Sequence, residues 1–363
     1  MNRIILSVTF MITYLPITYA QSPEIIIEKV SKHWFSLNNN FSNPSDSKGN
    51  YPLDLTLEAL LVFDEYTNQN NCISLVERVY QNRGINPDDT ISYRIQPFCS
   101  MNFTLGMVSK NKEWFNGFIA ESYKMKQELR RSEDGAVMIN HEGGHYILMD
   151  YLQEYASRIA KTGWLVKDTC LFEESVNQFK IYELILRNSE TGLWSQGRGW
   201  IDGSSQLSPG AWSRGHGWLL RGLVTSMMFL PNKYRKQLLP VLKRTAYSLL
   251  KVQAENGMWH ILLHLPAGDS EPDVSGTGMI AYYLALAVNN QWLPQNDFEL
   301  TILKSTESLR NFVTPKGQVL NSCKGPGPLY SIEDYIDYHP ETDEKHGFQA
   351  MIYGMMGEMI IKE

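Results

Sequence analysis

Apolar residues recur at helical spacing along almost the whole chain, and this periodicity constrains the fold more than any other feature. Within 150–162, for example, Leu152, Tyr155 and Ile159 fall on one helical face. No stretch shows the convincing alternation that predicts a strand. We therefore expect about twelve helices. They are expected at residues 23–37, 52–67, 72–83, 97–108, 112–126, 150–162, 168–187, 214–229, 232–252, 275–289, 296–313 and 345–361.

The expected helices alternate between two kinds. One kind is apolar over much of its surface and begins beside Gly, Trp, His or Asp, whereas the other is amphipathic with a charged outer face. This pairing predicts an all-α fold, an (α/α)6 barrel of six inner and six outer helices. An open solenoid is the alternative, but it would show repeat-like identity between its units, and we see none. The loops before the inner helices should gather at one end and line a cleft.

The first twenty residues have the parts of a secretory signal peptide. Arg3 supplies a positive charge, residues 4–17 are apolar, and Thr-Tyr-Ala at 18–20 fits a cleavage site. An uncleaved anchor is the alternative, but the apolar stretch is short for a bilayer span. We expect an exported protein, periplasmic or secreted, without membrane contact after signal removal. Residues 21–363 would form one catalytic domain.

Composition limits the partners of the chain. Its 363 residues carry a net charge of -6, so the basic surface that nucleic-acid binding requires is absent. An acidic substrate would have to be bound by a few local Arg or Lys side chains. The four cysteines are widely and irregularly spaced, which predicts structural thiols, one disulfide being the alternative, and gives no sign of a metal site. They are Cys72, Cys99, Cys170 and Cys323.

One cluster of chemically active residues spans 140–150. It contains His141, Glu142, His145 and Asp150, just before an expected helix. The two histidines are four residues apart, but Gly143-Gly144 between them argues against the helix that a zinc HExxH motif needs. Asp150 is therefore either a helix N-cap or an acid/base group, and the pattern alone favours the cap.

A second cluster reads Trp212-Ser213-Arg214-Gly215-His216-Gly217-Trp218 at a loop-to-helix junction. The Arg214 guanidinium can bind a carboxylate with two parallel hydrogen bonds. Trp212 and Trp218 can stack on sugar rings, and we take His216 as a further substrate contact. The alternative is a packed crossing of Gly-rich and Trp-rich helices. Among the smaller groups, Trp200 is a candidate sugar contact, Ser275 or Thr277 would cap a helix, and His346 has no assigned role.

In this order, these clusters resemble the unsaturated rhamnogalacturonyl hydrolases, glycoside hydrolase family 105, and the related unsaturated glucuronyl hydrolases. The resemblance runs from about residue 50 to the end and is most specific in the Trp-x-Arg-Gly-x-Gly-Trp element. It is carried by Leu148-Met149-Asp150, Thr191-Gly192-Leu193-Trp194, residues 212–218, Ser275-Gly276-Thr277-Gly278 with residues 281–285, and His346-Gly347.

The resemblance implies an (α/α)6 barrel, no cofactor, and Asp150 as the acid/base catalyst. The substrate would be an oligosaccharide with a 4,5-unsaturated uronic acid at its non-reducing end, produced from pectin by a lyase. Hydration of the double bond, with one carboxyl giving and taking the proton, would release the next sugar. This differs from ordinary glycoside hydrolysis, which needs two carboxylates.

The chain departs from the family pattern at two places. Gln196 stands near the position of a family histidine, whose role His145, His141 or His216 would take, and we expect Gln196 and His145 to contact the substrate. Residues 96–102 lack the acid usual there. We therefore also consider a catalytically silent sugar-binding protein. A conventional glycosidase using Asp150 with Asp202 or Glu142 is a further alternative. Oligomeric state is not readable from the sequence.

Overall fold

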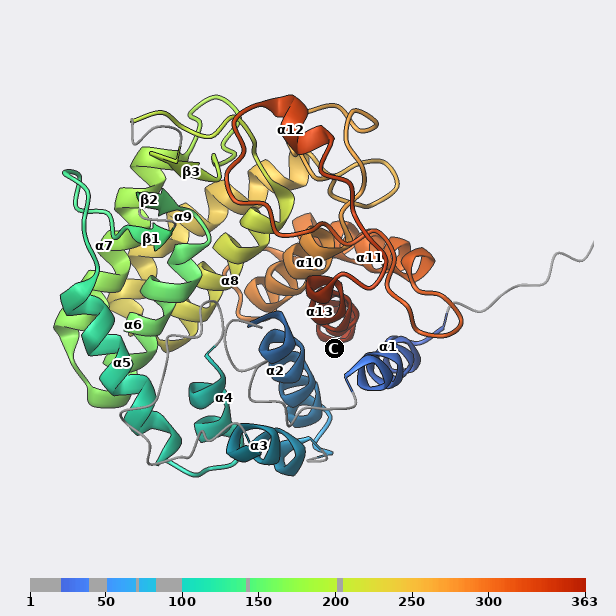
Figure 1. The fold of residues 1–363 in the computed structure, drawn as a ribbon, viewed down its shortest axis with the longest axis horizontal. Helices are drawn as coiled ribbons and strands as arrows, with labels where there is room; N and C mark the ends of the chain where they lie inside the picture. The colour runs from blue at the N-terminus through green and yellow to red at the C-terminus, as the bar shows by residue number, and fades with distance from the viewer. Residues whose placement is uncertain (1–20, 39–50, 70–71, 83–99, 142–143, 201–204) are drawn as a thin grey trace, which may run out of the picture.

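A computed structural model describes residues 21–38, 51–69, 72–82, 100–141, 144–200 and 205–363. The predicted signal peptide therefore lies outside the described residues. The described chain forms two concentric layers of helices, which Figure 1 shows end-on. Among these helices none is both long and apolar enough to cross a bilayer.

The inner layer follows from helices that are apolar on nearly every side. In α10, for instance, fourteen residues from Val274 to Val288 are buried. A helix without a polar face must be covered all round. The inner helices are α2 (Tyr51–Tyr66), α4 (Met101–Val108), α6 (Ser157–Val166) with the π-helical turn η2 (Leu152–Ala156) before it, α8 (Ser213–Phe229), α10 (Val274–Asn289) and α13 (Lys345–Lys362).

The outer layer consists of helices with one buried face, which cover the inner ones. In α9 the buried residues Leu238, Leu242 and Leu249 lie on one stripe, and charged residues occupy the rest. The outer helices are α1 (Pro23–Leu37), α3 (Ile73–Asn82), α5 (Trp114–Glu128), α7 (Thr169–Leu186), α9 (Asn232–Lys251) and α11 (Gln295–Leu309). The predicted (α/α)6 barrel is thus confirmed, and helix boundaries mostly agree within two residues.

The ring closes where the last inner helix, α13, packs on both α10 and α2. The crossing of α10 and α13 is close, because a β-carbon on Gly278 would overlap the backbone of Ala350. Only glycine permits two helices to approach in this way. Closure therefore brings the first and last inner helices side by side.

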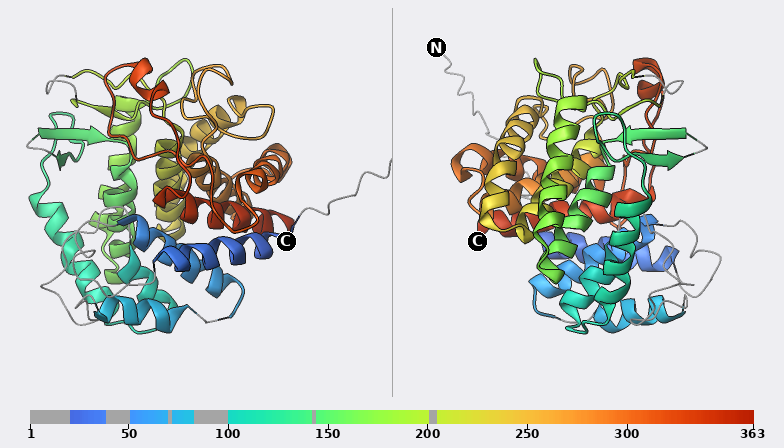
Figure 2. Two further views of the ribbon diagram at one scale, coloured as in Figure 1. Left: turned by 45° about the vertical axis from the view of Figure 1, so that its right-hand side comes forward. Right: turned by 90° about the vertical axis from the view of Figure 1, so that its left-hand side faces the viewer.

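The prediction that strands are absent is wrong. A small antiparallel sheet joins β1 (Ile139–His141), β2 (Gly144–Leu148) and β3 (Gly197–Arg198) in that order. A short helix, α12 (Ile332–Ile336), was also not predicted. Figure 2 shows the sheet and α12 on the same side of the barrel, within the layer of long loops.

Candidate active site

The loops at one end of the barrel bring several polar side chains together at the starts of inner helices. Tyr51 is the first residue of α2, and Asp150 stands just before η2. Arg214 lies in the first turn of α8, and His346 in the first turn of α13. Residues far apart in the sequence thus meet around Asp150, as the barrel prediction required.

The Asp150 carboxyl is buried, since the residue is only 6% exposed. Burial raises its pKa from 3.8 to about 7, although the charge of Arg214 and the backbone N–H of Asp150 act against the shift. The carboxyl can therefore be protonated near neutral pH. This is the property that a general acid needs.

The N-cap alternative for Asp150 does not hold. Tyr151, not Asp150, occupies the cap position of η2, and no side chain caps this turn. Within the described residues, Asp150 Oδ1 is buried without a hydrogen-bond partner. It faces the first turn of α8, 3.4 Å from where a β-carbon on Gly215 would lie. A buried oxygen without a partner is costly, so it marks a place where a ligand would bond.

Arg214 is the cation of the site. Its Nη1 donates to Ser275 Oγ at 3.1 Å and to the Cys323 carbonyl, and lies 3.8 Å from Glu344 Oε2. Its guanidinium lies over the ring of Trp212, 4.7 Å from the centroid. Nε is buried and has no hydrogen-bond partner among the described residues. The head group is therefore fixed, while donor capacity remains for an anionic ligand.

Asp273 holds the starts of α8 and α10 together. It caps α10 by accepting from the backbone of Ser275 and Gly276, and it accepts from Ser213 Oγ at 2.6 Å. It also accepts from the Cys323 backbone at 3.2 Å. The expected cap at Ser275 or Thr277 is therefore wrong. Fully buried Asp273 thus ties these helix starts to Cys323, whose carbonyl accepts from Arg214.

A chain of three side chains adjoins Arg214. Tyr51 Oη lies 2.9 Å from His346 Nε2, and His346 Nδ1 lies 2.9 Å and 3.1 Å from the two oxygens of Glu344. These residues line a pocket of about 440 Å³, with Lys324 and Gly325. The sequence had flagged His346 without a role and missed Tyr51. A tyrosine directly before an apolar helix was the only signal.

Three predicted substrate contacts are instead part of the core. His216 is fully buried, accepting from the Trp194 backbone at 3.0 Å through Nε2 and bonding the Trp212 carbonyl at 2.8 Å through Nδ1. Trp218 is 2% exposed, with the Arg221 guanidinium over its ring. Trp212 is equally buried and carries Arg214 on its face. The structure thus places all three in the core, where Gly and Trp serve close packing, and their role as substrate contacts stays a prediction.

Gln196, another predicted substrate contact, is also buried. Its side chain is fully buried and accepts from Tyr335 Oη at 2.6 Å while donating to the Pro326 carbonyl at 3.0 Å. Gln196 thus ties the loop that contains Pro326 to Tyr335. A β-carbon on Gly325 would lie 3.1 Å from Arg214 Nη2, so the loop passes directly over the guanidinium.

Trp200 and His145 lie nearer the surface. Trp200 is partly exposed, with Tyr146 4.5 Å from its ring centroid and Gly327 against its edge, so the indole lies beside the loop. His145 is partly exposed in β2, within a hairpin rather than the helix a zinc motif would need. Glu142 and Asp202 lie outside the described residues. Among the described residues, no group of three side chains could hold a metal.

The cysteines differ in exposure. Cys323 is buried, Cys72 is half-buried and Cys170 is exposed, and all three are free thiols. Cys99 lies outside the described residues. The prediction of buried structural thiols therefore fits Cys323 best, since that residue is fully buried.

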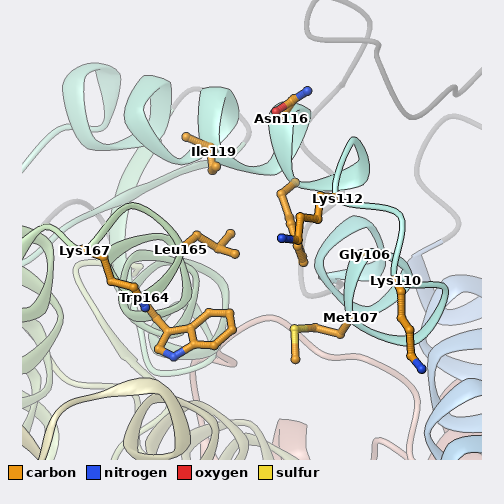
Figure 3. Close-up of a pocket in the computed structure, with 10 residues that line it drawn as sticks. Gly106, Met107, Lys110, Lys112, Asn116, Ile119, Trp164, Leu165 and Lys167 are labelled. Carbon is orange, nitrogen blue, oxygen red and sulfur yellow. The ribbon is translucent and has the colours of Figure 1, made fainter.

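A second hollow of about 490 Å³ lies at the opposite end of the barrel, between α4, α5 and α6 (Figure 3). It is lined by Met107, Trp164 and three lysines, of which Lys110 and Lys167 follow the C-terminal ends of α4 and α6. Lysines in such places offset the negative end of the helix dipole. The described residues that line it include no carboxyl or histidine, whereas Asp150 lies at the other end of the barrel.

Solved structures share this architecture over nearly the whole chain. A possible family 105 member from Salmonella enterica has a TM-score of 0.77 and 20% identity, covering 97% of this chain and 99% of that one. A family 105 glycoside hydrolase from C. acetobutylicum gives 0.78 and 21%, covering 92% and 99%. Unsaturated glucuronyl hydrolase from Bacillus sp. GL1 gives 0.65 and 13%, covering 94% and 96%. At such identities the likeness shows the fold.

The fold and the buried carboxyl are those of an α-barrel protein with a candidate acid/base group, and the family match makes the chain a glycoside hydrolase. The model of Glycosyl Hydrolase Family 88 matches residues 26–359, and the chain therefore belongs to that family. Two relatives are each called unsaturated 3S-rhamnoglycuronyl hydrolase. The one from Formosa agariphila is 33% identical over 134 residues, 36% of this chain and 31% of the relative. The one from Alteromonas sp. is 30% identical over 152 residues, 41% and 33%.

These matches span about a third of the length of the two relatives. They confirm the predicted kinship with the unsaturated glycuronyl hydrolases, and they leave the substrate of this chain to be proposed.

Proposed function

We propose that this protein removes a 4,5-unsaturated uronic acid from the non-reducing end of an oligosaccharide, with Asp150 as the acid/base catalyst. The observation that carries the proposal is the buried Asp150 carboxyl, whose pKa near 7 keeps it protonatable, beside the fixed cation of Arg214. Arg214 would bind the uronate carboxylate, and Trp200 would contact the sugar. Export to the periplasm or the medium is part of the proposal.

The reaction needs one carboxyl and one water molecule. Asp150 gives its proton to C4 of the double bond, and water adds to C5 while its proton goes to the Asp150 carboxylate. The hemiketal formed at C5 opens and releases the next sugar, and Asp150 is protonated again. Arg214 fixes the carboxylate carbon attached to C5, which places C4 against the acid.

Two substrates are candidates. Rhamnogalacturonan fragments from pectin are the first, because the motifs resemble family 105. The names of the two relatives favour a second one, a uronate joined to a rhamnose of another polysaccharide. Both candidates place a rhamnose next to the unsaturated uronate.

The test uses lyase-treated rhamnogalacturonan and other lyase-treated uronic polymers. Turnover should remove the ultraviolet absorbance of the conjugated double bond and release one sugar per bond lost. Release of reducing sugar from saturated substrates alone would instead support a conventional glycosidase. Saturable binding without turnover would support a sugar-binding protein.

The pH profile gives a further expected result. Since Asp150 must be protonated, kcat/KM should be highest below the pKa of about 7 and should fall roughly tenfold per pH unit above it. Initial rates between pH 5 and 9 would measure this. A rate that stays constant up to pH 9 would contradict the role of a protonated Asp150.

A further inference from the structure

Three side chains beside Asp150 form a hydrogen-bonded chain with a defined direction. Burial works against ionisation of Glu344, but hydrogen bonds from His346 and the charge of Arg214 lower its pKa to about 2. Glu344 is thus a carboxylate, which can only accept. His346 Nδ1 must therefore carry the hydrogen that bonds Glu344 at 2.9 Å.

The direction of hydrogen-bond donation can also be assigned between Tyr51 and His346. Burial, together with the charge of Arg214, lowers the pKa of His346, so the ring is neutral and Nε2 carries a lone pair. Tyr51 Oη, 2.9 Å away, therefore donates its proton to Nε2. A hydroxyl that donates its only hydrogen still accepts through its oxygen lone pairs. The chain thus presents the Tyr51 oxygen as an acceptor.

The Tyr51 oxygen lies beside the outer pocket, close to Arg214. Tyr51 and Gly325 both line the pocket of about 440 Å³. A β-carbon on Gly325 would lie 3.9 Å from Tyr51 Oη and 3.1 Å from Arg214 Nη2. On the inner side, Tyr51 is close enough to Asp150 for that charge to contribute to the raised pKa of Tyr51. Tyr51 is thus near both charged groups of the site, Arg214 and Asp150.

We propose that Tyr51, oriented by His346 and Glu344, is a positioning residue that holds the attacking water beside Asp150. The inference rests on the proposed function. The water donates one hydrogen bond to Tyr51 Oη and the other to the Asp150 carboxylate left after C4 is protonated. As the water oxygen adds to C5, the proton that it shares with Asp150 moves to that carboxylate. The other proton of the water remains on the new hydroxyl group, and Tyr51 keeps its own proton.

Replacement Tyr51→Phe keeps the ring and removes the acceptor. We expect kcat to fall roughly 10- to 100-fold, as for the loss of one buried hydrogen bond, with little change in KM. Tyr330→Phe, at a residue 63% exposed, is the matched control and should keep full activity. Glu344→Gln weakens the hydrogen bond that orients His346 and so affects Tyr51 only indirectly. It should give a smaller loss in kcat. Melting temperatures would verify that each variant is folded.

Competition by methanol separates positioning from a structural role. Methanol has one O–H and cannot donate to both Tyr51 and Asp150, so the native enzyme should prefer water. Addition of methanol at C5 removes the double bond but gives a ketal that cannot open. The ratio of absorbance lost to sugar released therefore measures the choice between the two nucleophiles, and this ratio should rise in Tyr51→Phe.

The outcomes are distinguishable. An unchanged kcat in Tyr51→Phe, or a lower kcat with an unchanged ratio, would overturn the positioning role and leave the proposed function intact. A native protein that fails to remove absorbance from every unsaturated substrate would overturn the proposed function, and the positioning role with it.

Discussion

Replacement of Asp150 by asparagine is expected to lower turnover of unsaturated substrates by between about a hundredfold and ten-thousandfold, the range for loss of a general acid/base. The amide has nearly the shape of the carboxyl, so KM should change little. Absorbance assays with purified enzyme would measure both constants. Asp168→Asn is the matched control, since Asp168 caps α7 through Cys170 N and asparagine caps equally well.

The same Asp150 variant should be more stable than the native protein at alkaline pH. The folded pKa of about 7 lies above the ordinary value of 3.8, so stability is fully present near pH 4 and is lost as pH rises through 7. The shift corresponds to roughly 4 kcal/mol once the carboxyl is ionised. Urea unfolding should give the variant and the native protein the same free energy of unfolding near pH 4. At pH 8 the value for the variant should be higher. Equal stability at pH 8 would contradict the raised pKa.

The second large effect concerns a buried ion pair inside the barrel. Arg221 Nη2 in α8 lies 2.6 Å from Glu58 Oε2 in α2, and both side chains are at most 6% exposed. Thr104 also donates to Glu58, at 2.9 Å. Replacement Arg221→Met would leave a buried carboxylate with weaker compensation, which should lower the free energy of unfolding by about 3–5 kcal/mol.

The loss of stability in Arg221→Met should depend on pH. Burial alone would raise the pKa of Glu58, and Arg221 is the first charge that lowers it. Without Arg221 the carboxyl would protonate more readily, so the destabilisation should be largest near pH 8 and smaller in acid. The double variant Arg221→Met with Glu58→Gln should recover much of the loss. Arg244→Met, which breaks a surface pair with Glu183, should cost less than about 1 kcal/mol.

Helices could be predicted from the sequence because their signal is local. The periodicity of residues 23–37 or 232–252 depends only on neighbours within the segment, and the structure places helices there. The sheet could not be predicted, because β2 is a short, partly exposed strand that pairs with Gly197 and Arg198 far along the chain. Tertiary contact, not local preference, makes these residues strands.

The site was only partly predictable for the same reason. Asp150 and Arg214 stand in motifs, and the structure brings them close together. The motif around Arg214 could not reveal that His216 and Trp218 turn into the core, because burial depends on the helices packed against them. Tyr51 was missed because its partner His346 lies 295 residues further along the chain.

Closure of the ring between α2 and α13 has a consequence for biosynthesis. The side chains around Asp150 come from both extremes of the barrel, with Tyr51 at its beginning and His346 near its end. A nascent polypeptide still lacking its final helix would possess the acid but not the completed surroundings. Catalytic competence should therefore arise late, only after α13 has been synthesised and the two ends of the ring have joined.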